Sequence, residues 1–286
     1  MEDLSRPEEV IEIWLREGYE KVYDATSNEF KKMVTLDQFM DLSASFNNGV
    51  KNYQLETKTM IQNLTQYVWL DDKREKAVLA SFDQFNRIQR FYLKPFSTFP
   101  KTDELYTKNK YIMPIRGEWL IFLGGTNEFI NYHYLYENQR YAYDLVKVRE
   151  GESYLNSPIQ NENFYAFDEA IIAPADGKVV KVVDGIKDNV PGEMEEHNPA
   201  GNYVVIEHVD NEFSMIAHFK QNSILVKPGE FVTEGQLIGK CGNSGNSSEP
   251  HIHFQVMDTD SKYGKSIRIL FKDGKEPIQG DMISNS

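Results

Sequence analysis

The sequence predicts two domains: an N-terminal α+β domain, with helices packed on an antiparallel sheet, and a C-terminal domain that is mainly β. Helical periodicity and capping signals fill the first fifty residues, and alternation of polar and apolar residues begins near residue 53. After residue 107 the chain consists of short β-runs separated by Gly, Pro, Asn and Asp. A length of 286 residues also suits about two domains.

The helices of the first domain are predicted by their start and stop signals. Ser5-Arg6-Pro7-Glu8 is a capping box with proline in the first turn, and the helix that follows ends near Gly18. A second helical stretch begins at about Tyr19. Thr35-Leu36-Asp37-Gln38 is another capping box, and Asn48-Gly49 ends the helix that it opens.

Four antiparallel strands should follow these helices. Short polar turns such as Asp71-Asp72-Lys73 join alternating segments at residues 53–59, 65–70, 76–83 and 88–94. We therefore assign residues 1–95 to the first domain, 96–106 to a connector without clear periodicity, and 107–286 to the second domain.

The second domain should contain small, strongly bent sheets. Residues 173–180 and 226–239 each place glycine at a tight turn between β-branched runs. Residues 186–200 are polar, acidic and long enough to leave the sheet, and we expect them to form one wall of a cleft.

Composition excludes several classes of partner. The net charge of −13 disfavours nucleic acid and anionic lipid. The longest apolar run, residues 119–123, is far too short for a membrane span. Cys241 is the only cysteine, which excludes an intrachain disulfide. Residues 1–5 lack the basic start and apolar run of a secretory signal, which predicts either an intracellular protein or a trimmed leader.

Two histidines one residue apart form the most informative motif. His251 and His253 lie on a predicted strand after the small-residue loop 239–250, so their side chains project to the same face. Neutral imidazole is a common zinc ligand and also transfers protons near neutral pH. One of the two histidines can therefore hold a metal while the other handles protons.

Asp144, His133 and His218 are the other candidates for this site. Asp144 stands at the inner end of an apolar strand, where it needs an arginine, another cation or a metal. His133 lies beside tyrosines, where a packed core histidine is the commoner outcome. His218 belongs to residues 213–219, the expected hairpin partner of residues 201–208.

These motifs resemble the M23 family of zinc metallopeptidases, the lysostaphin and LytM type of peptidoglycan endopeptidase. The resemblance implies bent antiparallel sheets and zinc-dependent hydrolysis of peptide bonds in peptidoglycan. It extends in order over about half of the chain. The matching segments are Ala173-Pro174-Ala175-Asp176-Gly177-Lys178-Val179, Gly201-Asn202-Tyr203-Val204-Val205-Ile206-Glu207-His208, Ala217-His218-Phe219, Gly235-Gln236-Leu237-Ile238-Gly239, Gly242-Asn243-Ser244-Gly245 and His251-Ile252-His253-Phe254.

The resemblance also implies a role for each candidate residue. One Zn²⁺ per chain would be held by His133, Asp144 and His253, which leaves a fourth position open to water. His218 and His251 would be the free catalytic pair.

One departure from the family pattern concerns His133. The family commonly places its first histidine four positions before the aspartate, where this sequence has Arg140, and arginine cannot replace that ligand. His133 lies eleven positions before Asp144. We expect His133 to reach the metal from an adjacent strand, with residues 135–139 forming a turn.

The other features receive structural assignments. His208 should be a hydrogen-bonded structural residue, and His197 should be exposed to solvent. The first domain resembles the small cone-shaped NTF2-like domains, and we assign its aromatic residues to the sheet core rather than to a ligand pocket.

Two other functions stay open. The odd spacing before Asp144 also suits a catalytically inactive M23-like module that binds or regulates at the cell wall. The hairpins at residues 226–229 and 232–235 would suit a phosphate-carrying sugar-transport domain. The family resemblance implies a place in the cell envelope or outside the cell, with peptidoglycan peptides as partners. The sequence specifies neither the bond cleaved nor the oligomeric state.

Overall fold

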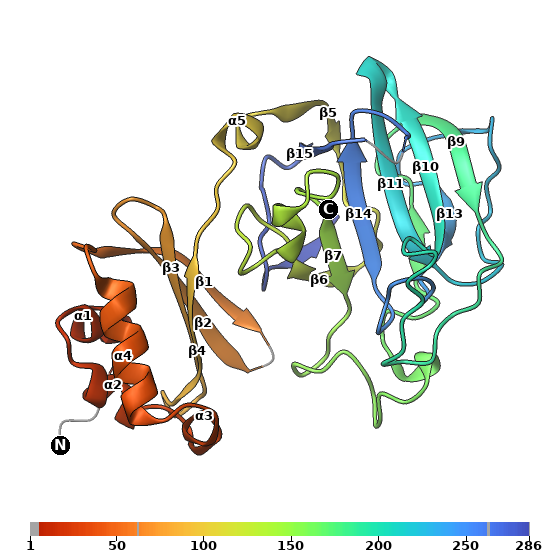
Figure 1. The fold of residues 1–286 in the computed structure, drawn as a ribbon. Helices are drawn as coiled ribbons and strands as arrows, with labels where there is room; N and C mark the ends of the chain where they lie inside the picture. Colours follow the sequence, from red (N-terminus) through yellow and green to blue (C-terminus); the bar gives the residue numbers. More distant parts are fainter. Residues whose placement is uncertain (1–5, 62, 262–263, 286) are drawn as a thin grey trace. The chain divides into compact units, whose positions relative to one another are not determined.

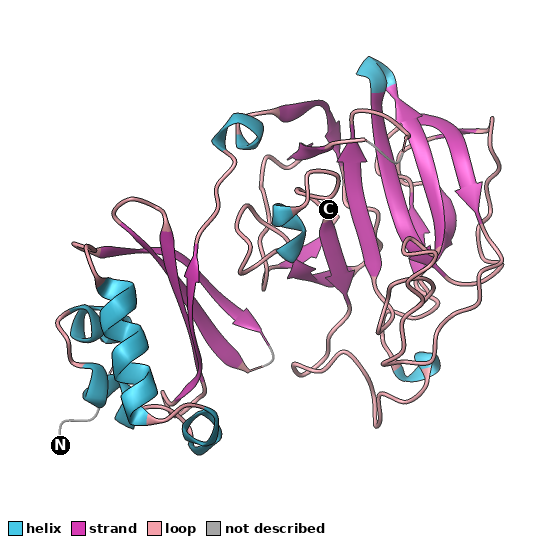
Figure 2. Cartoon of the chain, in the orientation of Figure 1, coloured by secondary structure: helices cyan, strands magenta, loops and turns pink. Residues whose placement is uncertain are grey.

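The computed structural model describes residues 6–61, 63–261 and 264–285. The chain divides into two compact units, residues 1–98 and 99–286. Most of the elements in the described residues are strands, and the helices are few and short (Figures 1 and 2). The described chain is therefore mostly β.

Helices open the first unit. Oγ1 of Thr35 accepts a hydrogen bond from the backbone N–H of Gln38, and the Gln38 side chain accepts one from the backbone N–H of Thr35, which confirms the capping box predicted there. Ser5 of the other predicted box lies outside the described residues. The helices are η1 (Pro7–Glu9, a 3₁₀ helix), α1 (Val10–Leu15), α2 (Tyr19–Asp24), α3 (Asn28–Met33) and α4 (Leu36–Asn47).

A four-stranded antiparallel sheet completes this unit, in the order β1-β2-β3-β4. Aromatic side chains join it to the helices: the ring centroid of Phe91 lies 5.5 Å from that of Trp14 and 5.3 Å from that of Phe39. The strands are β1 (Tyr53–Ile61), β2 (Leu64–Asp71), β3 (Lys76–Phe82) and β4 (Ile88–Pro95). The unit is of the α+β type, and its relation to NTF2-like domains stays a prediction.

One large sheet dominates the second unit. Its strand order is β12-β9-β10-β11-β14-β7-β6-β16, with β15 pairing to both β14 and β5, and a separate small sheet contains β13 and β8. The strands are β5 (Tyr106–Tyr111), β6 (Glu118–Leu123), β7 (Tyr143–Val146), β8 (Ala170–Ile172), β9 (Gly177–Val183), β10 (Asn202–His208), β11 (Glu212–Phe219), β12 (Phe231–Val232), β13 (Leu237–Lys240), β14 (Ile252–Met257), β15 (Ser266–Phe271) and β16 (Met282–Ser284). The hairpin predicted over residues 201–219 is confirmed as β10 and β11.

Helices in the second unit are short. They are α5 (Pro100–Asp103), which lies in the segment predicted to be a connector, and the 3₁₀ helices η2 (Tyr132–Leu135), η3 (Asn161–Asn163) and η4 (Val209–Asn211). Residues 184–201 contain neither helix nor strand, in agreement with the excursion predicted over residues 186–200. Within the part of the chain that the structure describes, every helix is too short or too polar to cross a membrane.

Strand β14 lies between β11 and β7 and sets the direction in which the side chain of His253 points. Ile252 and Phe254 are fully buried in the core cluster of this unit. Because side chains alternate along a strand, His253 and Gln255 project to the other face of β14, as does His251 just before it.

Candidate metal centre and catalytic site

Strand pairing sets Asp144 opposite His253. Asp144 is the second residue of β7, and its Cα partner on β14 is His253. On its other side His253 pairs with Ala217 of β11, which places His218 at the next position. His218 has a φ of +65°, in the left-handed region that non-glycine residues rarely adopt. The sheet thus brings together residues from three separate parts of the sequence.

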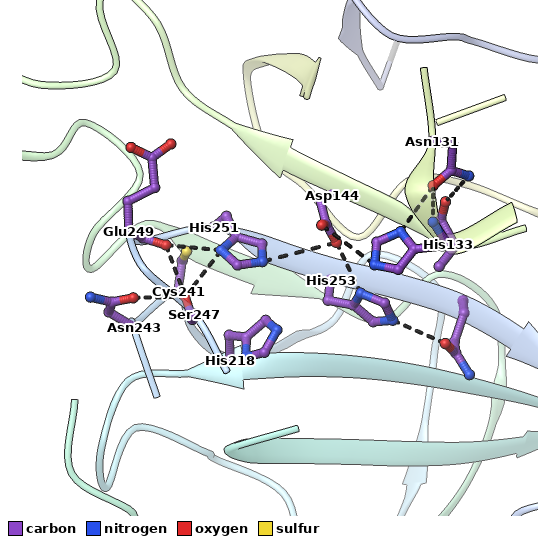
Figure 3. A network of polar contacts seen from close by, with 12 residues as sticks. Asn131, His133, Asp144, His218, Cys241, Asn243, Ser247, Glu249, His251 and His253 are labelled. Carbon is purple, nitrogen blue, oxygen red and sulfur yellow. Dashed lines mark hydrogen bonds and ion pairs between the residues drawn. The ribbon is translucent and has the colours of Figure 1, made fainter. Parts of the chain in front are cut away.

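His133, Asp144 and His253 converge in a buried cluster (Figure 3). One potential ligand atom from each lies within 4.8 Å of those of the other two. Nδ1 of His253 is 2.9 Å from Oδ1 of Asp144, and Nε2 of His133 is 3.7 Å from Oδ2. Asp144 is only 5% exposed. The three residues that sequence reasoning assigned to the metal are therefore close neighbours.

His133 reaches this cluster from a 3₁₀ helix, so the expectation of an adjacent strand is wrong. Asn131 precedes η2, and its side chain accepts a hydrogen bond from the backbone N–H of His133 at 3.2 Å. Backbone hydrogen bonds between residues three apart recur from Asn131 to Ala142. These successive turns coil the segment back toward β7, and they leave no extended run that could pair as a strand.

Arg140 stands where the family commonly has a histidine, but it contacts other residues. Its Nε donates to the carbonyl of Tyr134 at 3.0 Å, and its Nη1 donates to Oγ1 of Thr102 at 3.0 Å. The guanidinium carbon lies 3.6 Å from the ring centroid of Phe99. Arg140 therefore holds its segment against residues 99–102 and leaves the ligand position to His133.

His251 and His218 stand beside the cluster (Figure 3). Nε2 of His251 is 3.9 Å from Oδ1 of Asp144. The ring centroid of His218 lies 4.6 Å from that of His251 and 6.0 Å from that of His253. Two imidazoles thus flank the three clustered residues.

Hydrogen bonds to oxygen atoms determine what the four histidines can offer to a ligand. In each ring one nitrogen lies close to an oxygen of a residue outside the cluster of His133, Asp144 and His253: His133 Nδ1 to Asn131 Oδ1 at 2.9 Å, His253 Nε2 to Gln255 Oε1 at 2.9 Å, His251 Nδ1 to Glu249 O at 2.8 Å and His218 Nδ1 to Ser244 O at 2.7 Å. A neutral imidazole has a single N–H, and carbonyl oxygens only accept, so the other nitrogen of each neutral ring carries a lone pair.

These lone pairs make the cluster suitable for a cation. Nε2 of His133 and Nδ1 of His253 both face the Asp144 carboxylate, which is itself an acceptor, and only the His253 nitrogen is close enough to share a proton with it. Buried acceptors that face one another are unfavourable unless a positive charge joins them. Two imidazole nitrogens and one carboxylate oxygen are ligands that Zn²⁺ prefers. The donor set therefore fits a divalent metal such as zinc.

Electrostatic interactions keep Asp144 ionised and His133 neutral, the forms that bind a metal. Burial would raise the pKa of Asp144, but His133, His251 and His253 outweigh burial and lower it, so the carboxylate is ionised. Burial lowers the pKa of His133 to about 4, so this ring is neutral at neutral pH. Burial disfavours the charged form of His253, yet Asp144 raises its pKa, and a metal would compete with that proton.

His208 and His197, the histidines away from the cluster, lie as predicted, and the cysteine is buried. His208 has Nδ1 2.8 Å from the carbonyl of Asp176 and Nε2 2.7 Å from Oγ of Ser214, which confirms a structural role. The side chain of His197 is 95% exposed. Cys241 is fully buried in the core cluster.

The excursion over residues 184–201 contacts the loop that leads to His251. Nδ2 of Asn189 donates to the carbonyls of Gly245 at 2.7 Å and Ser247 at 2.9 Å. Oγ of Ser247 in turn lies 3.1 Å from Nδ1 of His251. The excursion therefore supports the segment that positions a candidate catalytic histidine.

Sequence reasoning missed the residues that hold the histidines. Gln255 could have been found, because alternation places it on the same face as His251 and His253. Asn131 carries a weaker signal, since asparagine commonly bonds to the backbone two residues further on. The contact of Glu249 with His251 uses a backbone carbonyl, which no residue type reveals.

Comparisons with known proteins concern mainly the C-terminal part of the chain. Residues 163–267 match the profile of Peptidase family M23, a segment that contains His218, His251 and His253 and begins after His133 and Asp144. The chain is 43% identical to the peptidoglycan DD-endopeptidase ShyA of Vibrio cholerae over 61 residues, which cover 21% of this chain and 14% of ShyA. It is 33% identical to the murein hydrolase activator NlpD of Escherichia coli over 102 residues, or 36% of this chain and 22% of NlpD.

The chain thus spans less than a quarter of the length of these relatives. Among solved structures, lysostaphin from Staphylococcus simulans is 22% identical, with 44% of this chain and 40% of that chain covered and a TM-score of 0.29, too low to support a conclusion. The family profile and the sequence relatives are sufficient: the chain carries a domain of peptidase family M23.

Proposed function

We propose that this protein is a zinc-dependent endopeptidase that hydrolyses peptide bonds in peptidoglycan and acts in the cell envelope. One observation carries the proposal: His133, Asp144 and His253 converge in a buried cluster, with His251 and His218 beside it. The names of ShyA and NlpD, which refer to peptidoglycan and murein, support the choice of substrate and location.

His133, Asp144 and His253 would hold one Zn²⁺ per chain. Zinc bound by three protein ligands supplies Lewis-acid chemistry, which polarises a carbonyl and lowers the pKa of water. The protein contributes an ionised carboxylate and two imidazoles whose other nitrogens are held by Asn131 and Gln255. The buried position of the cluster strengthens the interaction of these groups with a cation.

His251 and His218 would move the protons of the reaction. Each has its Nδ1 beside a backbone carbonyl, so Nε2 of the neutral ring is free to accept a proton from the attacking water. The protonated ring then donates to the amine that leaves. Nε2 of His251 lies 3.9 Å from Oδ1 of Asp144, a proposed metal ligand. This nitrogen is therefore close to the proposed metal position, which favours His251 as the base. Burial holds the pKa of His218 well below its usual value, so this ring is neutral at neutral pH.

The test is to measure bound zinc and the release of peptides from purified peptidoglycan. We expect one zinc per chain and hydrolysis in the wild type, and loss of both in Asp144→Ala. Asp210→Ala, which changes a half-exposed aspartate outside the cluster, is the matched control and should behave as the wild type. A wild type that binds no zinc would contradict the proposal.

A second candidate is a non-catalytic regulator of other cell-wall hydrolases. The similarity to NlpD, which is called an activator, favours this alternative. A protein that binds zinc stoichiometrically, releases no peptide from peptidoglycan, and increases peptidoglycan hydrolysis by a purified hydrolase would support it over the endopeptidase.

A further inference from the structure

We infer that Asn131 is the positioning residue of the metal centre: its side-chain amide fixes the ring tautomer of His133 and thereby directs Nε2 of that ring toward Asp144. The inference rests on the proposed function in one respect, because it treats His133 as a metal ligand. It assigns to Asn131 a role that neither the family profile nor the sequence motifs cover, since Asn131 precedes the matched residues 163–267.

The orientation of the Asn131 amide is determined by its neighbours. Nδ2 lies 3.1 Å from the carbonyl of Gly125 and 3.1 Å from the carbonyl of Ala142, and both of these can only accept. The other amide atom lies 3.2 Å from the backbone N–H of His133, which can only donate. Three independent partners therefore require that oxygen, and not nitrogen, faces His133 (Figure 3).

This orientation decides the tautomer of His133. The same Oδ1 lies 2.9 Å from Nδ1 of His133, so Nδ1 must carry the proton of the neutral ring. Nε2 is then left with a lone pair, 3.7 Å from Oδ2 of Asp144. The opposite tautomer would place two acceptors 2.9 Å apart at Nδ1 and would direct an N–H into the proposed metal position. Asn131 is fully buried, so water does not replace it.

Asn131 also joins the two ends of the segment that carries His133. Its donors reach Gly125, before η2, and Ala142, just before β7 with Asp144. These bonds close the loop between the two residues. They explain how a histidine eleven positions from the aspartate is brought to it, although the family pattern uses a separation of four.

In His253 the opposite ring nitrogen faces Asp144, and a neighbouring side-chain amide again decides which one. Nε2 of Gln255 donates to the carbonyl of Asn138 at 3.0 Å, so Oε1 of Gln255 faces Nε2 of His253. His253 consequently presents Nδ1 to Asp144, whereas His133 presents Nε2. Opposite nitrogens are used in the two rings, and in each case an amide oxygen with a forced orientation occupies the other nitrogen.

The test reads the tautomer directly in the metal-free chain of 286 residues. Long-range ¹H–¹⁵N NMR at neutral pH distinguishes a protonated from an unprotonated ring nitrogen. We expect Nδ1–H for His133 in the wild type and a mixture of tautomers in Asn131→Ala. Asn127→Ala is the matched control, because Asn127 is also buried and bonds the same loop through the backbone N–H groups of Phe129 and Ile130 without contacting His133.

Zinc affinity, measured by competition with a chelator, is the second readout. Asn131→Ala should bind zinc about 10- to 100-fold more weakly, the usual effect of removing such a partner, while Asn127→Ala should keep its affinity within about threefold. Asn131→Asp keeps an oxygen beside Nδ1 and should retain the Nδ1–H tautomer.

The outcomes separate this inference from the proposed function. Nε2–H as the main tautomer of wild-type His133 overturns the inference, even if Asn131→Ala does not fold. Unchanged tautomer and zinc affinity in Asn131→Ala overturn it and leave the proposed function intact. A wild type without zinc affinity contradicts the proposed function, while the spectrum of the metal-free protein still decides whether Asn131 fixes the ring.

Discussion

Glu212, the first residue of β11, is a buried carboxylate whose removal should destabilise the second unit. Its oxygens accept hydrogen bonds from the backbone N–H groups of Lys108 and Asn109, from the Asn109 side chain and from the Tyr111 hydroxyl. Tyr111 is fully buried, whereas Lys108 is exposed and Asn109 half-buried. Water can therefore replace the carboxylate at the two backbone groups, but not at the Tyr111 hydroxyl.

The expected loss of stability in Glu212→Ala follows from these hydrogen bonds. An unsatisfied Tyr111 hydroxyl costs about 1–3 kcal/mol, and weaker bonds at the other donors add about 1 kcal/mol. We expect Glu212→Ala to lower the free energy of unfolding by about 3 kcal/mol. Tyr111→Phe should cost about 1–2 kcal/mol less in the Glu212→Ala background than in the wild type, because the unsatisfied hydroxyl is then absent.

Urea unfolding followed by circular dichroism measures these differences in the four proteins of the cycle. Glu196→Ala, at an exposed glutamate in the excursion, is the control and should change stability by less than about 0.5 kcal/mol. A coupling energy below about 0.3 kcal/mol between Glu212 and Tyr111 would refute the reasoning.

Three further predictions concern pH, backbone conformation and chemistry. Burial lowers the pKa of His208, so the unfolded chain binds more protons than the folded one and the free energy of unfolding falls as pH drops below 6.5. Urea unfolding at about pH 7.5 and about pH 5.5 should show a smaller loss of stability in His208→Phe than in the wild type, and an unchanged loss in His197→Gln. Equal losses in all three proteins would contradict this prediction. Gly201 has a φ of +58°, and a Cβ there would lie 2.3 Å from the carbonyl oxygen of Ser244. Gly201→Ala should therefore lower the free energy of unfolding by about 2 kcal/mol or more. Wild-type stability of this variant in a urea titration would contradict the prediction. His251→Ala should retain one zinc per chain but lose about 100-fold or more in peptide release, and full activity would remove His251 from the mechanism.

Alternation and hairpin signals were sufficient to predict the central part of the site. The period of two along β14 placed His251 and His253 on one face, and the apolar run ending in Val146 placed Asp144 on a strand. The hairpin of β10 and β11 followed from the two neighbouring strand-like runs at residues 201–208 and 213–219. These are local patterns, and each depends on residues within one element or one turn.

The path of the chain to His133 could not be predicted in the same way. Its 3₁₀ helix is held by Asn131, whose partners Gly125 and Ala142 lie six and eleven residues away. Arg140 turns toward residues 99–102, a contact across the fold that no spacing reveals. Periodicity reports which face a residue occupies within its element, but not which distant backbone groups its side chain bonds.

The affinity of His133→Ala for zinc tests the central claim most directly. The account predicts one zinc per wild-type chain and a loss of affinity in His133→Ala as large as that in Asp144→Ala and His253→Ala, with circular dichroism unchanged. Wild-type zinc affinity in a folded His133→Ala protein would contradict the account, because the third ligand would then have to be another residue.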